Sequence, residues 1–177
     1  ISGVYFIGKT IWEKGLDTLI DIACRTGQQV DVFGDGPDSE AVRTTARERG
    51  APLRFHGASD SPWTMLSDYR VFLNPSQSET ICTTTAEALV AGRHVVLPAC
   101  PGNDPFLKYP NAHFYRDVDG AVAALRRALA ELPVPPTEAR QDFDWPTACR
   151  TLAGICGVLP AGAAIGRPSF TESAADG

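Results

Sequence analysis

The chain has 177 residues, 44% of them hydrophobic and 21% charged, which is enough to bury the core of a single domain. Its formal net charge of −5 disfavours nucleic acid and anionic lipid as general partners, because broad electrostatic binding to either requires clustered Lys and Arg. An anionic ligand would therefore have to be held by a local site.

Neither a membrane span nor a disulfide framework is indicated. No apolar run approaches the ~18 residues of a membrane-spanning helix. The five cysteines are odd in number and include no Cys-x-x-Cys pair, so we expect them to be reduced and not to bind zinc. The sequence opens at Ile1 on residues typical of a core strand, without a start methionine or targeting peptide, and we therefore expect a piece of a longer protein.

Short apolar runs alternate with longer amphipathic runs along the chain, a pattern typical of parallel strands joined by helices. We predict strands at residues 4–7, 30–33, 53–55, 71–73, 94–97 and 113–115. Several of these runs are almost wholly apolar, as expected for strands covered on both faces. The predicted fold class is α/β, with a Rossmann-like parallel sheet flanked by helices.

Helices are predicted at residues 14–25, 39–49, 83–91, 118–130 and 145–156. In the fourth, Val118, Val122, Leu125 and Leu129 recur at steps of three and four residues and form one apolar stripe. A proline-stiffened connector at 132–138 precedes the last helix. The residues that follow the last helix show no periodicity, so we predict a nucleotide-sugar-binding domain at 1–158 and a disordered tail at 159–177.

Four segments follow directly after predicted strands, at residues 8–15, 34–37, 74–79 and 98–104. In an open parallel sheet, ligands bind beyond the carboxyl ends of the strands, and these ends share one edge. We therefore expect a binding site at this edge.

Glycines and lysines in the first two segments favour an anionic ligand. Gly8, Gly34 and Gly36 let the backbone approach a ligand closely. Lys9 and Lys14 flank a helix entry, where free N–H groups suit a diphosphate. Two alternatives stay open, because the segment with Gly34 and Gly36 suits a tight turn by its own composition, and isolated lysines are more often solvated surface residues.

Two glutamates follow the fourth predicted strand. Thr83 opens a hydroxyl-bearing run suited to capping a helix, which places Glu79 in the loop and Glu87 about one turn inside the helix. Both carboxylates would converge on one ligand and accept hydrogen bonds from sugar or ribose hydroxyls. In the alternative, Glu87 is only a favourable charge near a helix N-terminus and Glu79 is an exposed loop residue.

Together these segments resemble the C-terminal, donor-binding half of retaining glycosyltransferases of the GT-B type, whose signature is Glu-x7-Glu. The resemblance covers about residues 4–157. Within it, the segments 5–15, 71–76 and 82–89, with the Pro-x-Asn segment at Pro101, look like the digalactosyldiacylglycerol synthases of plants and algae.

This resemblance implies transfer of galactose from UDP-galactose to the sugar of monogalactosyldiacylglycerol, with retention at the anomeric carbon. By matched position, the lysines hold the diphosphate, Glu79 contacts the donor sugar and Glu87 binds the ribose hydroxyls. Glu79 and Lys14 are the implied catalytic residues. The implied donor-binding set is Gly8, Lys9, Lys14, Gly34, Gly36, Glu79, Thr80, Ile81, Cys82, Thr83 and Glu87.

Such a site must stabilise the negative charge that develops on the departing UDP, for which lysines and a helix N-terminus are suitable groups. We expect no metal and no cofactor, with UDP-galactose as the donor substrate. The galactolipid acceptor should bind mainly through an N-terminal half, so the segment alone should be inactive. The resemblance also implies peripheral contact with a membrane, at the outer membrane of the chloroplast envelope.

Two other interpretations remain. One keeps the fold but changes the donor or acceptor, as in a sucrose-, sterol- or protein-directed glycosyltransferase. The other is a non-catalytic remnant that serves as an interaction or membrane-docking module. Donor profiling tests the first, and failure of UDP to protect the intact protein against thermal unfolding would favour the second.

Overall fold

The computed structural model describes residues 3–58, 68–78 and 82–156. The predictions for Glu79, Thr80, Ile81 and the tail at 159–177 lie outside these ranges, as does the predicted domain boundary at residue 158. Contacts within the chain divide it into one unit up to Ala139 and a second from Arg140 onward, and each is described by itself.

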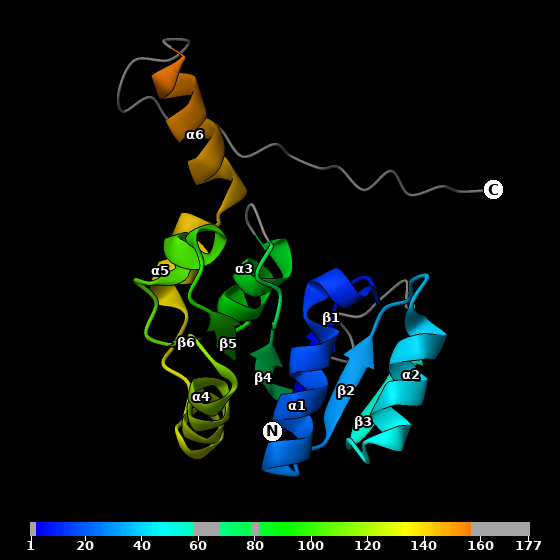
Figure 1. Ribbon diagram of the computed structural model, residues 1–177. Coiled ribbons are helices and arrows are strands. Elements are labelled where there is room, and N and C mark those ends of the chain that lie inside the picture. Colours follow the sequence, from blue (N-terminus) through cyan, green and yellow to red (C-terminus); the bar gives the residue numbers. More distant parts are fainter. Residues whose placement is uncertain (1–2, 59–67, 79–81, 157–177) are drawn as a thin grey trace, which may run out of the picture. The chain divides into compact units, whose positions relative to one another are not determined.

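The first unit is built on a sheet of parallel strands (Figure 1). Its strands in the described part of the chain are β1 (Gly3–Ile7), β2 (Val30–Phe33), β3 (Leu53–Gly57), β4 (Tyr69–Leu73), β5 (His94–Pro98) and β6 (Ala112–Tyr115). They lie in the order β3-β2-β1-β4-β5-β6, and all neighbouring pairs are parallel. All six predicted strands are confirmed. The order of the strands reverses between β1 and β4, which makes the gap between these two the topological switch point of the sheet.

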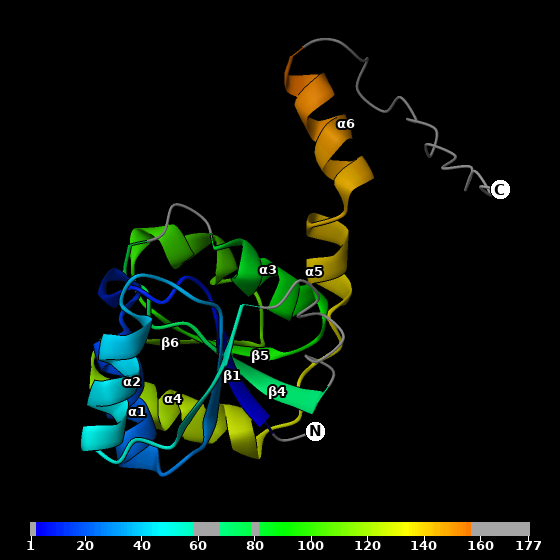
Figure 2. The ribbon, with the colours of Figure 1, turned by 90° about the vertical axis from the view of Figure 1, so that its right-hand side faces the viewer.

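Helices cover both faces of this sheet. They are α1 (Leu16–Thr26), α2 (Ser39–Glu48), α3 (Thr83–Val90) and α4 (Val118–Ala130). The 3-10 helices η1 (Trp12–Lys14) and η4 (Pro101–Phe106) follow β1 and β5, and α5 (Thr137–Asp142) runs across the boundary between the two units. Helices α1, α2 and α4 pack on one face and α3 on the other, as Figures 1 and 2 show. Successive residues of β1 alternate between the two cores, with Val4 in the first and Tyr5 in the second, as the two-residue period of a strand requires.

The structure differs from the prediction at three local places. The helix expected from residue 14 begins at Leu16, because Gly15 takes a left-handed φ of 73° that closes η1 and opens α1. Helix α5 starts inside the stretch predicted as a connector, directly after the last of its prolines, where no proline ring remains to obstruct helical hydrogen bonds. The segment that follows β5 contains the 3-10 helix η4, where only a loop was expected.

A pair of buried histidines joins β5 to β6. His113 Nε2 lies 2.9 Å from His94 Nδ1, and His94 Nε2 lies 3.2 Å from the carbonyl oxygen of Glu131. Because a carbonyl can only accept, His94 carries its hydrogen on Nε2, and its Nδ1 accepts from the Nε2–H of His113. Burial lowers the pKa of both rings and brings that of His113 to about 4, so the pair is neutral.

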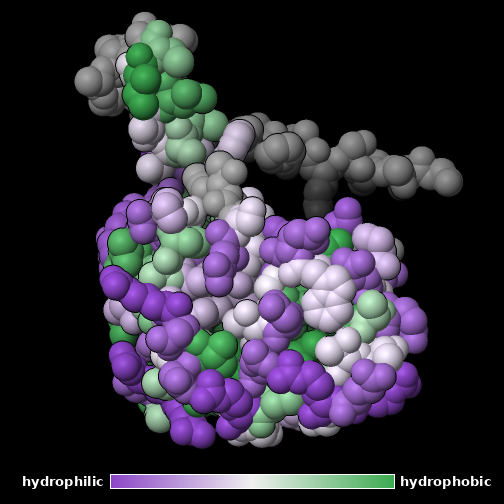
Figure 3. Space-filling view, in the orientation of Figure 1, coloured by the Kyte–Doolittle hydropathy of each residue, from purple (hydrophilic) through white to green (hydrophobic). Residues whose placement is uncertain are grey.

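The second unit contains α6 (Trp145–Ile155). Asp144 caps it by accepting from the N–H of Thr147 at 3.0 Å. Taken by itself, α6 exposes Trp145, Leu152 and Ile155, and its apolar surface is visible in Figure 3. Within the described ranges, no helix combines the length and apolar character needed to cross a membrane.

Candidate functional site

The carboxyl ends of β1 and β4, on the two sides of the switch point, share a hollow with the start of α3. We call it the lysine hollow. Its volume is about 190 Å³, and it is lined by Phe6, Ile7, Gly8, Lys9, Lys14, Asn74, Cys82, Thr83 and Thr84. Five of the predicted site residues therefore meet here, namely Gly8, Lys9, Lys14, Cys82 and Thr83. The switch point is where open α/β sheets place their ligands.

A second hollow of about 200 Å³, the glycine hollow, lies beyond the end of β2. It is lined by Ile7, Gly8, Lys9, Phe33, Gly34, Asp35 and Ala58. The two hollows share Ile7, Gly8 and Lys9, so they adjoin across the end of β1. Of the predicted residues, Gly34 lines this second hollow, whereas Gly36 lines neither.

Close backbone contacts explain why glycine occupies three positions in these loops. A Cβ on Gly34 would overlap the carbonyl oxygen of Gly8, and one on Gly36 would overlap the carbonyl oxygen of Thr10. A Cβ on Gly15 would overlap the carbonyl oxygen of Pro75. The loops after β1, β2 and β4 are therefore interlocked through glycine.

The wall formed by the β4–α3 loop is organised by Asn74. Its Oδ1 accepts from the N–H of Ser76 at 3.1 Å, and its Nδ2 donates to Cys82 Sγ at 3.3 Å. The same sulfur lies 3.0 Å from the hydroxyl of Thr84. Asn74 is buried, so these bonds fix the loop against the end of β4.

The start of α3 differs from the prediction that a threonine hydroxyl caps it. The N-cap residue is Cys82, and its side chain makes no capping hydrogen bond. The N–H groups of Thr85 and Ala86 donate to the carbonyl of Cys82. Those of Thr83 and Thr84 have no partner within the described ranges, and both residues line the lysine hollow. Uncapped N–H groups at a helix start, beside two lysines, suit an anion.

Glu87 lies in α3, four residues after Thr83 and thus on the same side of the helix, one turn further along. The residue is exposed, yet partial dehydration raises the pKa of its carboxyl above the usual value. Burial also raises the pKa of the Tyr5 hydroxyl, which the charge of Arg93 lowers and that of Glu87 raises. Glu87 therefore lies near enough to Tyr5 for its charge to act on the Tyr5 hydroxyl, although Glu87 does not line the lysine hollow.

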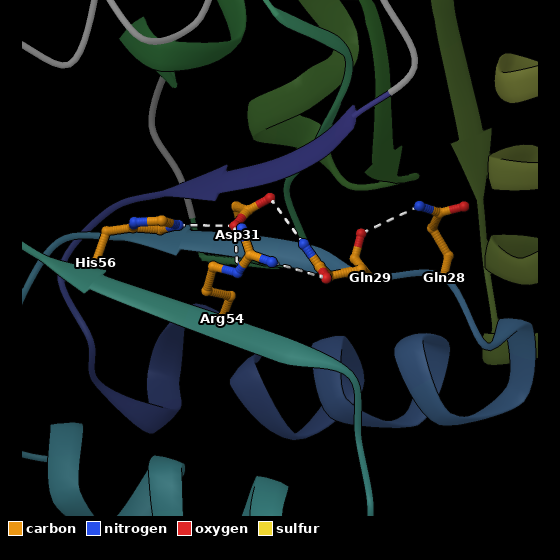
Figure 4. A network of polar contacts seen from close by, with 5 residues as sticks. All are labelled: Gln28, Gln29, Asp31, Arg54 and His56. Carbon is orange, nitrogen blue, oxygen red and sulfur yellow. Dashed lines mark hydrogen bonds and ion pairs between the residues drawn. The ribbon is translucent and has the colours of Figure 1, made fainter.

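A polar network joins β2 to β3 through Asp31, Arg54 and His56 (Figure 4). Asp31 Oδ1 lies 2.7 Å from His56 Nε2 and 3.8 Å from Arg54 Nε, and the ring of His56 stacks on Phe33 at 4.5 Å. Burial and the adjacent Asp31 raise the pKa of Tyr69 to about 12. Because Phe33 lines the glycine hollow, the network supports one of its walls.

Some residues that line the hollows were not predicted. Asn74 and Asp35 lie in the segments 74–79 and 34–37, which were expected to form the binding edge, but neither was named as a site residue. Asp31 and Phe33 lie inside a predicted strand, and nothing in their spacing marked them. Within the described ranges, no group of three His, Cys, Asp or Glu side chains is placed to hold a metal ion.

Comparison with protein families matches residues 2–132 to a family described as "Glycosyl transferases group 1". The chain belongs to this family. Among individual relatives of this group 1 glycosyl transferase, digalactosyldiacylglycerol synthase 2 of Glycine max is 42% identical over 155 residues, covering 84% of the chain and 34% of the relative. A GDP-mannose-dependent alpha-mannosyltransferase of Mycolicibacterium smegmatis is 30% identical over 165 residues, covering 85% of the chain and 42% of the relative. The chain thus spans a third to two fifths of the length of these relatives.

Solved structures of glycosyltransferases share the fold. The lipopolysaccharide outer core galactosyltransferase WaaB superposes with a TM-score of 0.78 at 22% identity, covering 90% of this chain and 50% of that one. HepE of Anabaena, in complex with UDP-glucose, superposes with a TM-score of 0.76 at 16% identity, covering 89% of this chain and 49% of that one. The Rossmann-like sheet of this group 1 glycosyl transferase is accordingly one half of a GT-B architecture.

Proposed function

We propose that this chain forms the UDP-galactose site of a galactosyltransferase that converts monogalactosyldiacylglycerol to digalactosyldiacylglycerol with retention of anomeric configuration. The observation that carries the proposal is the lysine hollow, which brings two lysines and the uncapped start of α3 together at the switch point of the sheet. The acceptor would bind through a part of the protein outside this chain, so the chain alone would be inactive.

In this proposal the lysine hollow holds the diphosphate. When the bond between the sugar and the diphosphate breaks, negative charge develops on the leaving phosphate oxygen. Lys9, Lys14 and the N–H groups of Thr83 and Thr84 would stabilise that charge, with Lys14 as a catalytic residue. Preorganised donors of this kind offer a route to leaving-group stabilisation without a metal or other cofactor.

The other parts of the donor follow from this placement. The glycine hollow adjoins the lysine hollow and offers the close backbone at Gly34 to the nucleoside. Glu87, one turn beyond the phosphate site, would accept hydrogen bonds from the ribose hydroxyls. Glu79, Thr80 and Ile81 remain predictions for the sugar and phosphate contacts, with Glu79 catalytic.

Galactose as the sugar and a galactolipid as the acceptor rest on the similarity to the digalactosyldiacylglycerol synthases, which bear the word chloroplastic in their names. We accordingly propose a chloroplast location, peripherally at the outer envelope membrane. The mannosyltransferase relative favours a second candidate, a GDP-mannose-dependent transferase of the same fold.

The test is donor and acceptor profiling of the complete protein. UDP-galactose with monogalactosyldiacylglycerol should yield digalactosyldiacylglycerol, whereas GDP-mannose should yield no product. Glu87→Ala and Lys14→Gln should each reduce transfer severely while the fold is retained. Lys108→Gln is the matched control, because Lys108 is an exposed lysine that pairs with Glu138 at 3.9 Å and lines neither hollow.

Thermal unfolding gives an independent readout. UDP at about a hundred times its Kd should stabilise the complete protein by about 2.7 kcal/mol. Absence of protection by UDP, or equal activity of the Lys14 and Lys108 variants, would refute the proposed site. Product from GDP-mannose alone would favour the second candidate.

A further inference from the structure

The loop after β2 holds the loop after β1 at alternate residues. The N–H of Gly8 donates to the carbonyl of Phe33 at 3.0 Å, and the N–H of Thr10 donates to the carbonyl of Asp35 at 3.1 Å. The third contact in this series is made by a side chain, since the N–H of Trp12 donates to Asp38 Oδ2 at 3.1 Å. The series therefore continues the pairing of β1 and β2 into the two loops.

Asp38 is bonded to the loop after β1 at two points. Besides accepting from Trp12, its own N–H donates to the carbonyl of Thr10 at 3.3 Å. Gly36 packs against the same carbonyl, with no room for a side chain. Residues on both sides of Ile11 are thus fixed by one loop.

The bond from Trp12 is the start of the η1 turn that carries Lys14. The N-cap residue of η1 is Ile11, which has no side chain able to cap it. Within the turn, the N–H of Lys14 donates to the carbonyl of Ile11 and that of Gly15 to the carbonyl of Trp12. The carboxylate of Asp38, which is distant in the sequence, therefore takes the place of an N-cap side chain and also puts a negative charge at the start of the turn.

The loop that carries Asp38 is itself fixed. Asp35 Oδ1 accepts from the N–H of Gly36 at 2.8 Å and from the hydroxyl of Ser39 at 2.5 Å, and these bonds lower the pKa of Asp35. A fixed loop can hold a neighbouring loop in one position, whereas a mobile one cannot.

We infer that Asp38 is a positioning residue for donor binding, which caps the η1 turn across the two loops and so holds Lys14 at the lysine hollow. The inference rests on the proposed function of that hollow. It makes Asp38 a determinant of diphosphate affinity although Asp38 lines neither hollow.

The test uses Asp38→Ala and Asp38→Asn in the complete protein. The amide oxygen of asparagine can still accept from Trp12, so Asp38→Asn should stay within about twofold of the wild type, whereas Asp38→Ala should raise the KM for UDP-galactose and the Kd for UDP about tenfold. Asp117→Ala is the matched control, because Asp117 caps α4 by accepting from the N–H of Gly120 at 2.7 Å, three strands away from β1. It should lower Tm comparably to Asp38→Ala and leave the donor KM unchanged.

Amide hydrogen exchange separates this inference from the proposed function, since it needs no ligand. Asp38→Ala should accelerate exchange of the amides at residues 12–15 about tenfold, and Asp117→Ala should not. Unchanged exchange there, or equal donor KM values for the two alanine variants, would overturn the positioning role. If the wild type bound no UDP while exchange changed as expected, the capping of η1 would stand and the proposed function of the hollow would fail.

Discussion

The histidine pair of β5 and β6 makes folding stability depend on pH in a window where few other groups titrate. His113 has a pKa of about 4 in the folded chain against 6.5 in the unfolded chain, and that of His94 is lowered in the same direction. A base whose pKa is lowered by folding binds its proton preferentially in the unfolded state, so stability is complete above about pH 6.5 and is lost as the pH falls toward 4. At about 1.36 kcal/mol per pKa unit, His113 accounts for about 3 kcal/mol over the whole window, and about 2 kcal/mol of this is lost between pH 7 and pH 5.

Urea unfolding at pH 7 and pH 5 measures this difference, because ordinary carboxyl groups titrate mostly below that range. His113→Gln removes the titrating ring and leaves an amide that can donate to His94, so this variant should lose much less stability between the two pH values. The third histidine serves as the control, since His56 pairs with Asp31 at the opposite edge of the sheet. His56→Gln should therefore lose as much stability between the two pH values as the wild type does. Equal losses for the wild type and His113→Gln would refute the neutral pair.

Three further outcomes follow from the geometry. Gly15→Ala and Gly27→Ala both place alanine at a left-handed φ, but only the alanine at position 15 meets a carbonyl oxygen, that of Pro75. In urea unfolding, the free energy of unfolding should therefore fall by about 1 kcal/mol for Gly27→Ala and by at least about 3 kcal/mol for Gly15→Ala. Equal losses would contradict the interlocking of the loops. The affinity for UDP, measured by calorimetry, should fall as the pH is lowered, and the fall should begin at a higher pH than for an ordinary carboxyl because the pKa of Glu87 is raised. Glu87→Gln should abolish that fall. An unchanged pH profile in this variant would count against the ribose contact. Asp31→Ala removes the partner of the His56 ring and leaves Arg54 bonded only to Gln29, so it should destabilise the protein by about 2 kcal/mol in thermal unfolding. A Tm equal to that of the wild type would show that the network contributes nothing.

Much of the fold could be predicted because the apolar runs, such as residues 30–33 and 94–97, carry the periodicity of buried strands on their own. The site was partly predictable for the same reason, since Lys9 and Lys14 follow the end of a strand. Contacts between loops could not be predicted in this way. The bond from Trp12 to Asp38 joins residues 26 positions apart, and no local pattern encodes it.

Local chemistry also misled in particular places. The hydroxyl at Thr83 is a good cap by composition, but Cys82 occupies the N-cap position, and its sulfur contacts Asn74 and Thr84. Three prolines made 132–138 look like a rigid connector, although they end where helix α5 begins. Asp31 was hidden within an apolar strand, where only its partners on β3 reveal why a carboxylate is tolerated.

The contact of Gly15 with Pro75 has a consequence for engineering donor specificity. The segment after β1 and the segment after β4 pack closely against each other, so neither can be exchanged by itself. If only the segment after β1 were taken from a transferase with a different nucleotide sugar, it would no longer match the segment after β4 in this chain. Exchange of donor preference within this family should therefore succeed only when both segments are grafted together.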